Sequence, residues 1–320
     1  MNEKVIDYQS IKKNLKAFSS KKLCVMVKAN AYGLGMKEIC EFLKNKVDFF
    51  GVASYDEAVK VRELINTPIL IATTQRDIQK CKEHGFHFIV DNFLDLELSK
   101  QCEALNLVHI KLNTGMNRYG FDCEDKHVIK KLKLALKNQK IAGICIHFYN
   151  LSDKKTTKKQ YLKFRKIKKF LNVDCITHFG GSGVINYDFD YDMIRVGIGI
   201  YQNPNQVLRI YSHIEKINTY SRGELGYEGK FKITKDTKIA ILPIGYADGL
   251  LRSFSGLSVK INGKDCKIVG QICMDCCFVD VTKINCKVGD KVNVLPDLKK
   301  ASLHTKLTEY EILTGFSKIR

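Results

Sequence analysis

Short apolar runs alternate with longer amphipathic segments from residue 20 to about residue 200. The runs are rich in branched side chains and apolar on both faces, which is typical of parallel strands buried between helices. The eight runs are Leu23–Val27, Val47–Ala53, Ile69–Ala72, His87–Val90, Leu107–Leu112, Ile141–Phe148, Val173–Thr177 and Met193–Val196. Helical spacing between them predicts helices over Tyr55–Ile65, Asp77–His84, Leu94–Leu105, Glu124–Lys137 and Lys154–Leu171. Eight strands that alternate with helices predict an α/β fold, a TIM-like (β/α)8 barrel.

The pattern changes after a linker-like segment, Gln202–Gln206. Six apolar runs beyond it predict β-strands, over Leu208–Tyr220, Lys238–Ile244, Leu257–Ile261, Cys266–Ile272, Cys277–Val281 and Lys291–Leu295. One helix is predicted near Leu307–Phe316. We therefore expect two domains, a barrel over residues 1–206 and a mainly β domain over residues 207–320.

The chain has 320 residues and a formal net charge of +19, a balance that would suit a nucleic-acid partner. The basic residues are mostly lysine, however, and they are spread along the chain. The densest cluster, Lys154–Lys169, fits the outer face of one helix. Neither a basic-aromatic RNA motif nor a helix-turn-helix pattern accompanies it, so we predict no nucleic-acid partner.

The composition also bears on compartment and metals. No apolar run approaches the roughly 20 residues that cross a membrane, and residues 1–7 lack the apolar core of a signal peptide. We therefore expect no membrane association, a cytoplasmic location, and reduced thiols for the twelve cysteines. Cys273 and Cys276 fit a CxxC spacing, but a zinc or redox site usually needs a second pair or a thioredoxin-like context. We predict no metal site.

One lysine stands directly after the first predicted strand, in the run Val25-Met-Val-Lys28-Ala-Asn-Ala-Tyr-Gly-Leu-Gly35. Desolvation at the mouth of a buried strand would lower the pKa of Lys28 and favour the free amine that Schiff-base chemistry needs. Gly33 and Gly35 would let the backbone bend closely around a ligand. The alternative is a lysine whose side chain simply extends from the strand end to solvent.

Active-site residues of such barrels lie at the carboxyl ends of the strands. The fifth run leads into Lys111-Leu-Asn-Thr-Gly-Met-Asn-Arg118, whose arginine would suit a carboxylate clamp or an ordinary surface loop. The sixth run ends at His147, which on its own is more often a core residue. The seventh ends at His178, followed by Phe-Gly-Gly-Ser182, a sequence suited to phosphate binding.

Taken together these motifs resemble the alanine racemase family, which depends on pyridoxal 5'-phosphate (PLP). The resemblance rests on the Lys28 run, the Lys111–Arg118 segment and Arg195-Val-Gly197-Ile198. It extends through the second domain to Gly226-Tyr227-Glu-Gly, Pro243-Ile-Gly-Tyr246-Ala-Asp-Gly and Gly270-Gln-Ile-Cys-Met274-Asp. These occur in the family's order and spacing, and the likeness covers essentially the whole chain.

The resemblance implies a set of cofactor-binding residues. Lys28 would hold PLP as an aldimine, and His147 would lie beside the cofactor ring. The phosphate would be bound by Tyr32, Ser182 and the backbone of Gly197 and Ile198. Arg195, supported by His178, would face the pyridine nitrogen. An arginine there disfavours protonation of the ring, which limits carbanion delocalisation and suppresses transamination.

The resemblance also implies the reaction, an interconversion of L-alanine and D-alanine by two-base proton transfer on the PLP external aldimine. Lys28 would serve the D-isomer and Tyr227 the L-isomer, and the product would supply peptidoglycan. Arg118, oriented by an often carbamylated Lys111, and Met274 would contact the substrate carboxylate. The family implies a C2 homodimer whose partner chain contributes Tyr227, Met274 and the entrance residue Tyr246.

The chain departs from the family pattern at four places. Asn113 replaces aspartate, Gly181 replaces asparagine, Glu228 replaces glycine, and no tyrosine stands near Lys318. Three alternatives stay open: a racemase of another small amino acid such as serine, a related PLP decarboxylase, and a non-catalytic PLP-binding protein. The carboxylate contacts favour racemisation over decarboxylation. The β domain and its tyrosine argue against the binding protein.

Overall fold

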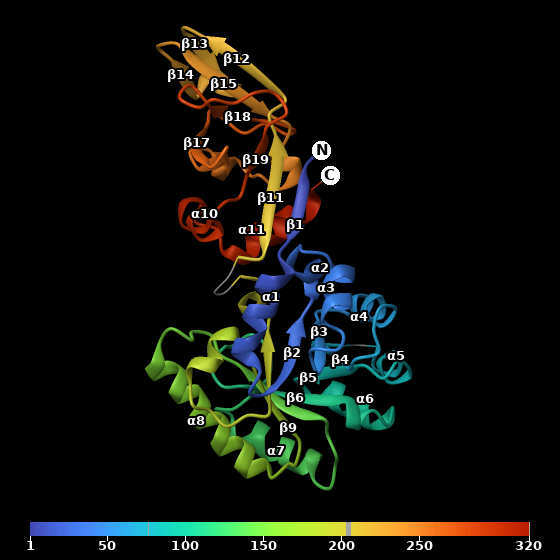
Figure 1. Ribbon diagram of the computed structural model, residues 1–320. Helices are drawn as coiled ribbons and strands as arrows, with labels where there is room; N and C mark the ends of the chain where they lie inside the picture. The colour runs from blue at the N-terminus through green and yellow to red at the C-terminus, as the bar shows by residue number, and fades with distance from the viewer. Residues whose placement is uncertain (76, 203–205, 320) are drawn as a thin grey trace. The chain divides into compact units, whose positions relative to one another are not determined.

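The computed structural model describes residues 1–75, 77–202 and 206–319, in which the eight apolar runs form a closed parallel barrel (Figure 1). Its strands are β2 Lys22–Met26, β3 Phe49–Val52, β4 Ile69–Thr74, β5 His87–Val90, β6 Val108–Asn113, β8 Gly143–His147, β9 Ile176–Gly180 and β10 Met193–Val196. Each pairs with the next, with one register shift between Ile71 and Thr74 in the β4–β5 ladder, and the β5–β6 and β10–β2 ladders close the ring. The predicted barrel is confirmed.

One predicted strand is displaced. The seventh run was expected over Val173–Thr177, whereas β9 spans Ile176–Gly180. The reason is that β9 ends in a histidine, a phenylalanine and a glycine, which hide the apolar pattern, while Val173 lies in the preceding loop. His178 therefore stands in the middle of its strand and not at the end.

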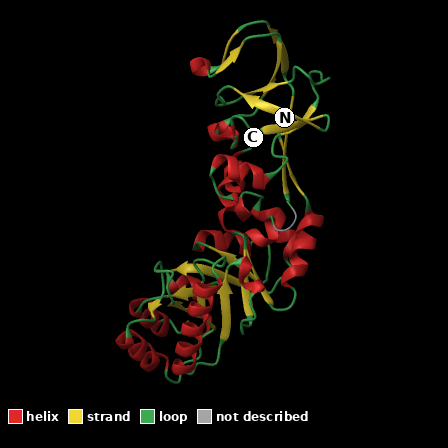
Figure 2. Cartoon of the chain, turned by 90° about the vertical axis from the view of Figure 1, so that its left-hand side faces the viewer, coloured by secondary structure: helices red, strands yellow, loops and turns green. Residues whose placement is uncertain are grey.

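Helices cover the outside of the barrel, as the red helices around the yellow strands show (Figure 2). They are α3 Met36–Leu43, α4 Tyr55–Arg62, α5 Ile78–Glu83, α6 Phe93–Gln101, α7 Lys126–Leu136 and α8 Lys154–Leu171. Four of them begin at a side-chain cap that accepts backbone N–H groups, namely Ser54, Asn92, Asp125 and Asp153. These caps fix where each helix starts and so how long each preceding loop is.

The chain divides into two compact units. The barrel unit comprises residues 13–31 and 36–200, and the second unit comprises residues 1–12, 32–35 and 201–320. The predicted boundary at residue 206 adjoins residues 203–205, which lie outside the described residues, and it stays a prediction. The start of the chain was not predicted to be structured, but it forms β1 Glu3–Ile6 and α1 Tyr8–Leu15.

The second unit is built on an eight-stranded sheet of order β1-β11-β19-β16-β17-β18-β15-β12. After β1 its strands are β11 Leu208–His213, β12 Lys216–Tyr220, β15 Thr237–Leu242, β16 Ser258–Ile261, β17 Lys264–Val269, β18 Cys277–Asp280 and β19 Lys291–Asn293. The long strand predicted from Leu208 is thus two strands, since the N–H of Ile214 bonds to Asp290 and that of Glu215 to Ile241. At this point the chain stops pairing with β19, the partner of β11, and begins to pair with β15, the partner of β12.

Smaller elements complete the fold. They are the hairpin β13 Gly223–Leu225 and β14 Phe231–Ile233, the short strand β7 Phe121–Asp122, and the helices α2 Lys28–Tyr32, α9 Ile198–Tyr201, α10 Leu298–Thr305 and α11 Glu309–Gly315. Single 3₁₀ turns are η1 Lys16–Phe18, η2 Leu105–Leu107, η3 Ser182–Asn186, η4 Tyr227–Gly229, η5 Tyr246–Asp248, η6 Arg252–Phe254 and η7 Phe316–Lys318. Within the described ranges, no helix has the length and apolar character that crossing a membrane requires.

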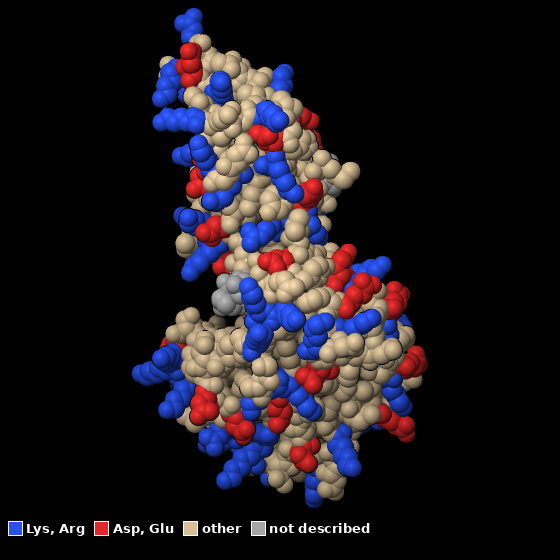
Figure 3. All heavy atoms as spheres, viewed as in Figure 1, with Lys and Arg blue, Asp and Glu red and all other residues tan. Residues whose placement is uncertain are grey.

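Lysine and arginine side chains are scattered over the face shown in Figure 3, with acidic side chains between them. They do not gather into one stripe on that face. On this face the positive charge is therefore spread out and not concentrated, as the sequence indicates.

Candidate active site

The backbone after the first barrel strand makes an unusual left-handed turn. Four consecutive residues, Ala29 to Tyr32, have φ between 51° and 58°. The turn is closed by a hydrogen bond of 2.8 Å from the Ala31 N–H to the Val27 carbonyl. A left-handed conformation costs an L-residue roughly 1–2 kcal/mol, and such strain is concentrated at functional sites. The turn sets the direction in which the neighbouring Lys28 leaves the barrel.

A single carboxylate holds this turn. Glu57, in the first turn of α4, accepts the Ala29 N–H at 2.7 Å through one oxygen and the Ala53 N–H at 2.8 Å through the other. On the far side of the turn, the Asn30 side chain accepts the Met36 N–H at 2.7 Å. The sequence alone does not reveal this role of Glu57, because a glutamate at this helix position ordinarily bonds to its own helix start.

Lys28 itself is exposed in this chain, so the expected desolvation at the strand mouth is wrong. The reason is that β2 ends two residues earlier, at Met26, and the strained turn carries the lysine clear of the buried strand. Its position at the carboxyl rim of the barrel agrees with the prediction.

Positive charges from four loops and strands converge on His147, at the end of β8. Burial, followed by the neighbouring charges of Arg195, Arg118, Lys111 and Lys28, lowers the pKa of His147 to about 3. His147 is therefore neutral near pH 7. Such a rim suits a ligand that carries phosphate and carboxylate groups.

Arg195, on β10, is fixed inside the rim by acceptors on Ile146 and His178. It donates to the Ile146 carbonyl at 2.9 Å and to Nδ1 of His178 at 2.5 Å. Gly180 makes room for this arrangement, because a Cβ there would lie 2.3 Å from the His147 ring and 2.6 Å from the guanidinium. His178 thus supports the arginine from mid-strand, whereas the sequence placed it at the strand end.

Ser182 and the turn after β10 come together. The serine hydroxyl accepts the N–H of Gly199 at 3.0 Å, which brings the serine next to Gly197 and Ile198. Gly181, where the family carries asparagine, has φ +117° and would place a Cβ 2.8 Å from Leu151. The backbone here therefore favours glycine, which accounts for the departure.

Lys111 is buried on β6, and its side chain lies near an aromatic ring. Burial is the main cause of its lowered pKa, and its amine lies 5.3 Å from the centre of the Tyr119 ring. Arg118 follows in the exposed loop beyond β6. The charge of Arg118 lowers the pKa of Lys111 further, so the two lie within electrostatic reach of each other.

The loop before Arg118 is organised by Asn113. Its side-chain oxygen accepts the N–H groups of Gly115 and Asn117 at 3.1 Å and 3.0 Å. The family's aspartate would offer the same acceptor. This departure therefore leaves the loop's main-chain contacts intact.

Tyr32 lies in the second unit, where its ring packs against two other tyrosines. The ring centres are 5.2 Å from Tyr201 and 5.8 Å from Tyr310 on α11. Helix α11 also approaches Gly33, at which a Cβ would lie 2.3 Å from the Leu313 carbonyl. Gly33 is thus required by the chain's own helix, in addition to any ligand. No motif in the sequence indicates that Tyr310 is a neighbour of Tyr32.

Two of the residues predicted in the second unit, Tyr227 and Met274, line one open hollow, and the motif of the third, Tyr246, adjoins it. The hollow has a volume of about 560 Å³ and is lined by Gly226, Tyr227, Cys273, Met274, Asp275, Cys276 and Phe278. Tyr227 is 65% exposed and Met274 is 54% exposed. The motif of Tyr246 is tied to that of Met274, since the Tyr246 N–H donates to Cys273 and the Ala247 N–H to Met274, both at 3.1 Å.

Glu228, next to Tyr227, occupies a backbone conformation that suits the family's glycine better. Its φ is +59°, and its exposed carboxylate pairs with Lys230 at 2.8 Å. The departure therefore strains the turn that carries Tyr227, as the sequence comparison with the family indicates.

The CxxC pair lies in the same hollow. The Cys273 thiol donates to the Gln271 carbonyl at 3.7 Å, and burial is the main cause that raises the pKa of Cys276 to about 11. Among the residues that the structure describes, no three His, Cys, Asp or Glu side chains are grouped so that they could hold a metal ion.

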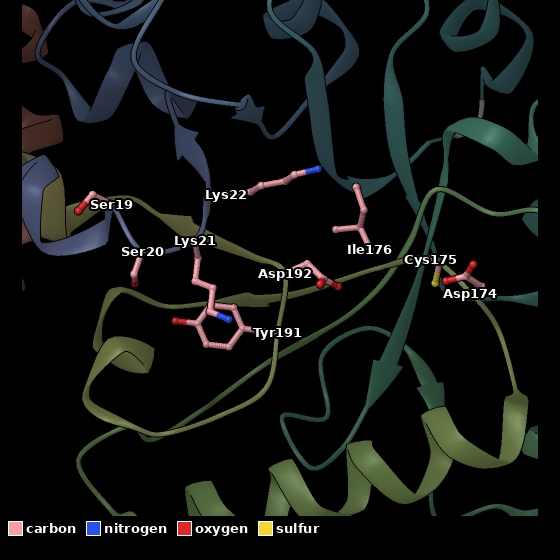
Figure 4. A pocket seen from close by; sticks show the side chains of 9 residues that line it. All are labelled: Ser19, Ser20, Lys21, Lys22, Asp174, Cys175, Ile176, Tyr191 and Asp192. Atoms are coloured by element: carbon pink, nitrogen blue, oxygen red, sulfur yellow. The ribbon is translucent and has the colours of Figure 1, made fainter.

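Another hollow, of about 650 Å³, opens at the amino ends of β2, β9 and β10 (Figure 4). Its contacts are structural: Lys21 lies 5.3 Å above the Tyr191 ring, and Asp192 accepts the Thr177 N–H at 2.7 Å. It contains none of the predicted site residues. In this fold the amino-terminal rim serves stability.

These features define a lysine-bearing (β/α)8-barrel protein followed by a mainly β unit. Residues 6–204 match the family model of the alanine racemase N-terminal domain, and residues 207–320 match that of the C-terminal domain. The chain therefore belongs to the alanine racemase family.

Individual relatives agree with this assignment over nearly the whole chain. An alanine racemase of Fusobacterium nucleatum is 32% identical and is matched over 98% of this chain and 96% of its own length. The structure of alanine racemase from Acinetobacter baumannii is 28% identical, with a TM-score of 0.89 over 98% of this chain and 96% of that one. That from Bartonella henselae, solved with covalently bound pyridoxal phosphate, is 26% identical, with a TM-score of 0.88 over 98% and 97%.

Removal of the Glu57 carboxylate is expected to loosen the lysine turn. Glu57→Ala leaves the N–H groups of Ala29 and Ala53 without this acceptor, and hydrogen bonds to charged groups contribute about 1.5–3 kcal/mol each. We expect a loss of about 2 kcal/mol or more in the free energy of unfolding, and faster amide exchange at Ala29. Chemical denaturation and hydrogen–deuterium exchange measure these. Asp56→Ala, which removes a carboxylate from the same helix turn, is the control, and equal exchange in both variants would contradict the assignment.

The strained turn at Glu228 yields a second test. Glu228→Gly and Glu228→Ala both lose the ion pair with Lys230, but only glycine relieves the left-handed strain. We expect the glycine variant to melt at a higher temperature than the alanine variant in calorimetry. If the alanine variant is the more stable, the turn is not strained.

Proposed function

We propose that this protein is a PLP-dependent alanine racemase that interconverts L-alanine and D-alanine. Membership of the family supports the activity. The observation that carries it on this chain is the convergence of Lys28, Lys111, Arg118 and Arg195 on His147. Two lysine amino groups and two guanidinium groups at one rim fit a ligand with an aldehyde, a phosphate and a carboxylate-bearing substrate.

The residues present fit PLP. Lys28 would hold it, Ser182 with the backbone of Gly197 and Ile198 and the hydroxyl of Tyr32 would bind its phosphate, and His147 would lie beside its ring. When bound, PLP takes up negative charge from the substrate α-carbon and so acidifies its proton. The remaining chemistry belongs to the protein.

Arg195 would keep the cofactor's ring nitrogen unprotonated. A guanidinium only donates hydrogen bonds and does not lose its proton in proteins. Its contacts with Ile146 and His178 hold it in one orientation. By donating to the ring nitrogen it would restrict how far charge spreads into the ring, and this favours return of the proton over side reactions.

Two bases would act on opposite faces of the α-carbon. The amine of Lys28 would move the proton of the D-isomer, and the phenol of Tyr227 that of the L-isomer. Arg118, oriented by Lys111, and the backbone N–H of Met274 would hold the substrate carboxylate, with Tyr246 at the entrance. Fixing the carboxylate leaves the α-proton pointing at one base or the other.

We further propose a C2 homodimer in which each site combines Lys28 of one chain with the partner subunit's Tyr227. The exposure of Tyr227 and Met274 in the single chain supports this, because large side chains in an open hollow are suited to an interface. A cytoplasmic location and a role in peptidoglycan supply stay predictions.

The activity is tested by D-alanine formation from L-alanine with purified protein and added PLP. We expect Lys28→Ala to be inactive and Tyr227→Phe to lose about 100-fold or more from L-alanine, since each removes a general base. Lys37→Ala and Tyr220→Phe, at exposed positions, are the matched controls. A wild type that binds PLP but turns over no alanine would overturn the proposal, and L-serine would then be assayed in the same way.

The shared site is tested by mixing the two inactive chains. When Lys28→Ala and Tyr227→Phe chains are co-expressed, a mixed dimer holds one site with both bases intact. Random pairing should then restore about a quarter of wild-type activity. If each site is built within one chain, no activity returns, and the dimer proposal fails.

A further inference from the structure

Three histidines form a line of hydrogen bonds behind Arg195, inside the barrel. His178 meets Arg195 at 2.5 Å, Nδ1 of His109 lies 2.8 Å from Nε2 of His178, and Nδ1 of His87 lies 3.0 Å from Nε2 of His109. The three residues come from β9, β6 and β5, so the line crosses the barrel interior. His109 and His178 have no solvent exposure.

The barrel is shaped to hold this line. Strand β8 lies between β6 and β9, and it carries Gly143 where His109 crosses to His178. A Cβ at Gly143 would lie 2.3 Å from Nδ1 of His109, so any other residue would obstruct that hydrogen bond. The edge of Phe49 packs against His87 and His109, with ring centres 5.2 Å and 6.5 Å apart. These contacts fix the ring orientations.

The arginine determines where every proton in the line lies. A guanidinium can only donate, so Nδ1 of His178 accepts and the proton of this neutral ring is on Nε2. That Nε2–H donates to Nδ1 of His109, whose own proton is therefore on Nε2. The Nε2–H of His109 donates in turn to Nδ1 of His87, so the proton of His87 is also on Nε2. Burial lowers the pKa of His87 to about 4 and those of His109 and His178 well below 6.5, so all three rings are neutral near pH 7.

We propose that His87 and His109 are positioning residues for the reaction, which act through His178 on Arg195. They hold His178 in the single tautomer that accepts from the guanidinium, and thereby fix the arginine that faces the cofactor ring. If His87 cannot accept, the proton of His109 is free to move to Nδ1. A proton on Nδ1 of His109 would require Nε2 of His178 to accept, so the proton of His178 would move to its own Nδ1. Two N–H donors, one from His178 and one from Arg195, would then face each other. The effect on turnover rests on the proposed function, whereas the tautomers are a property of the chain itself.

The tautomers are read directly from the protein without cofactor. Long-range ¹H–¹⁵N spectra of histidine-labelled protein distinguish protonated from unprotonated ring nitrogens, and single substitutions assign the eight histidines. We expect His87, His109 and His178 to carry their protons on Nε2 at pH 7. A proton on Nδ1 of any of the three, or a doubly protonated ring, would overturn the proposal.

Two variants at the far end of the line test its effect on the reaction. His87→Leu removes the acceptor for His109, while His87→Asn keeps an acceptor oxygen near the position of Nδ1. We expect His87→Leu to mix the tautomers of His178 and to lower kcat for alanine by about tenfold, with little change in KM, because a misoriented arginine impairs the chemical step. His87→Asn should recover most of both. His127→Leu, exposed on α7, is the control and should behave as wild type.

The results distinguish a failure of the histidine line from a failure of the proposed racemase function. Wild-type tautomers and kcat in His87→Leu, or equal impairment of the leucine and asparagine variants, would show that the line does not act on Arg195. If the wild type forms no D-alanine, the proposed function fails. The tautomer measurement on the cofactor-free wild type still tests the line in that case, including when His87→Leu does not fold.

Discussion

Closure of the barrel is the constraint on which the site depends. Eight strands run parallel, and the β5–β6 and β10–β2 ladders join the ends of the sheet. Every strand therefore ends at the same rim. Lys28 follows β2, Lys111 lies near the end of β6, His147 ends β8 and Arg195 lies on β10, so residues far apart in the sequence act on one another electrostatically. A slip in any one ladder would separate them.

That rim is electrostatically unfavourable without a ligand, since four cations surround one neutral histidine. The protein tolerates this by leaving Lys28 and Arg118 exposed to water and by fixing Arg195 on neutral acceptors. Anionic groups that enter the rim relieve the repulsion, which gives binding a favourable electrostatic term beyond individual hydrogen bonds.

The strained lysine turn also depends on compensation from a neighbour, because the hydrogen bonds to the Glu57 carboxylate offset part of the free-energy cost of its left-handed backbone.

The sequence indicated the elements of the barrel but not the contacts that join them. Seven of the eight strands follow directly from apolar runs, whereas β9 was displaced because His178 and Gly180 interrupt its pattern. The roles of Glu57 and His109 depend on partners that lie 28 and 69 residues away, and no local spacing reveals such pairs. The need for glycine at 143 and 180 is likewise visible only in the structure, where a Cβ at either position would collide with neighbouring side chains. The predicted site residues could be named from motifs, while their supporting residues could not.

The strand at the start of the chain has a consequence for how the protein is made. β1 pairs with β11, with Glu3 opposite Tyr211, so its partner is synthesised about 200 residues later. At translation rates of roughly 5–20 residues per second, residues 3–6 wait about 10–40 seconds before that ladder can form. The barrel unit, residues 13–31 and 36–200, is complete in the chain before then. The second unit can therefore be completed only after the barrel sequence has been made, and until then its first strand has an unpaired edge that is open to wrong pairing.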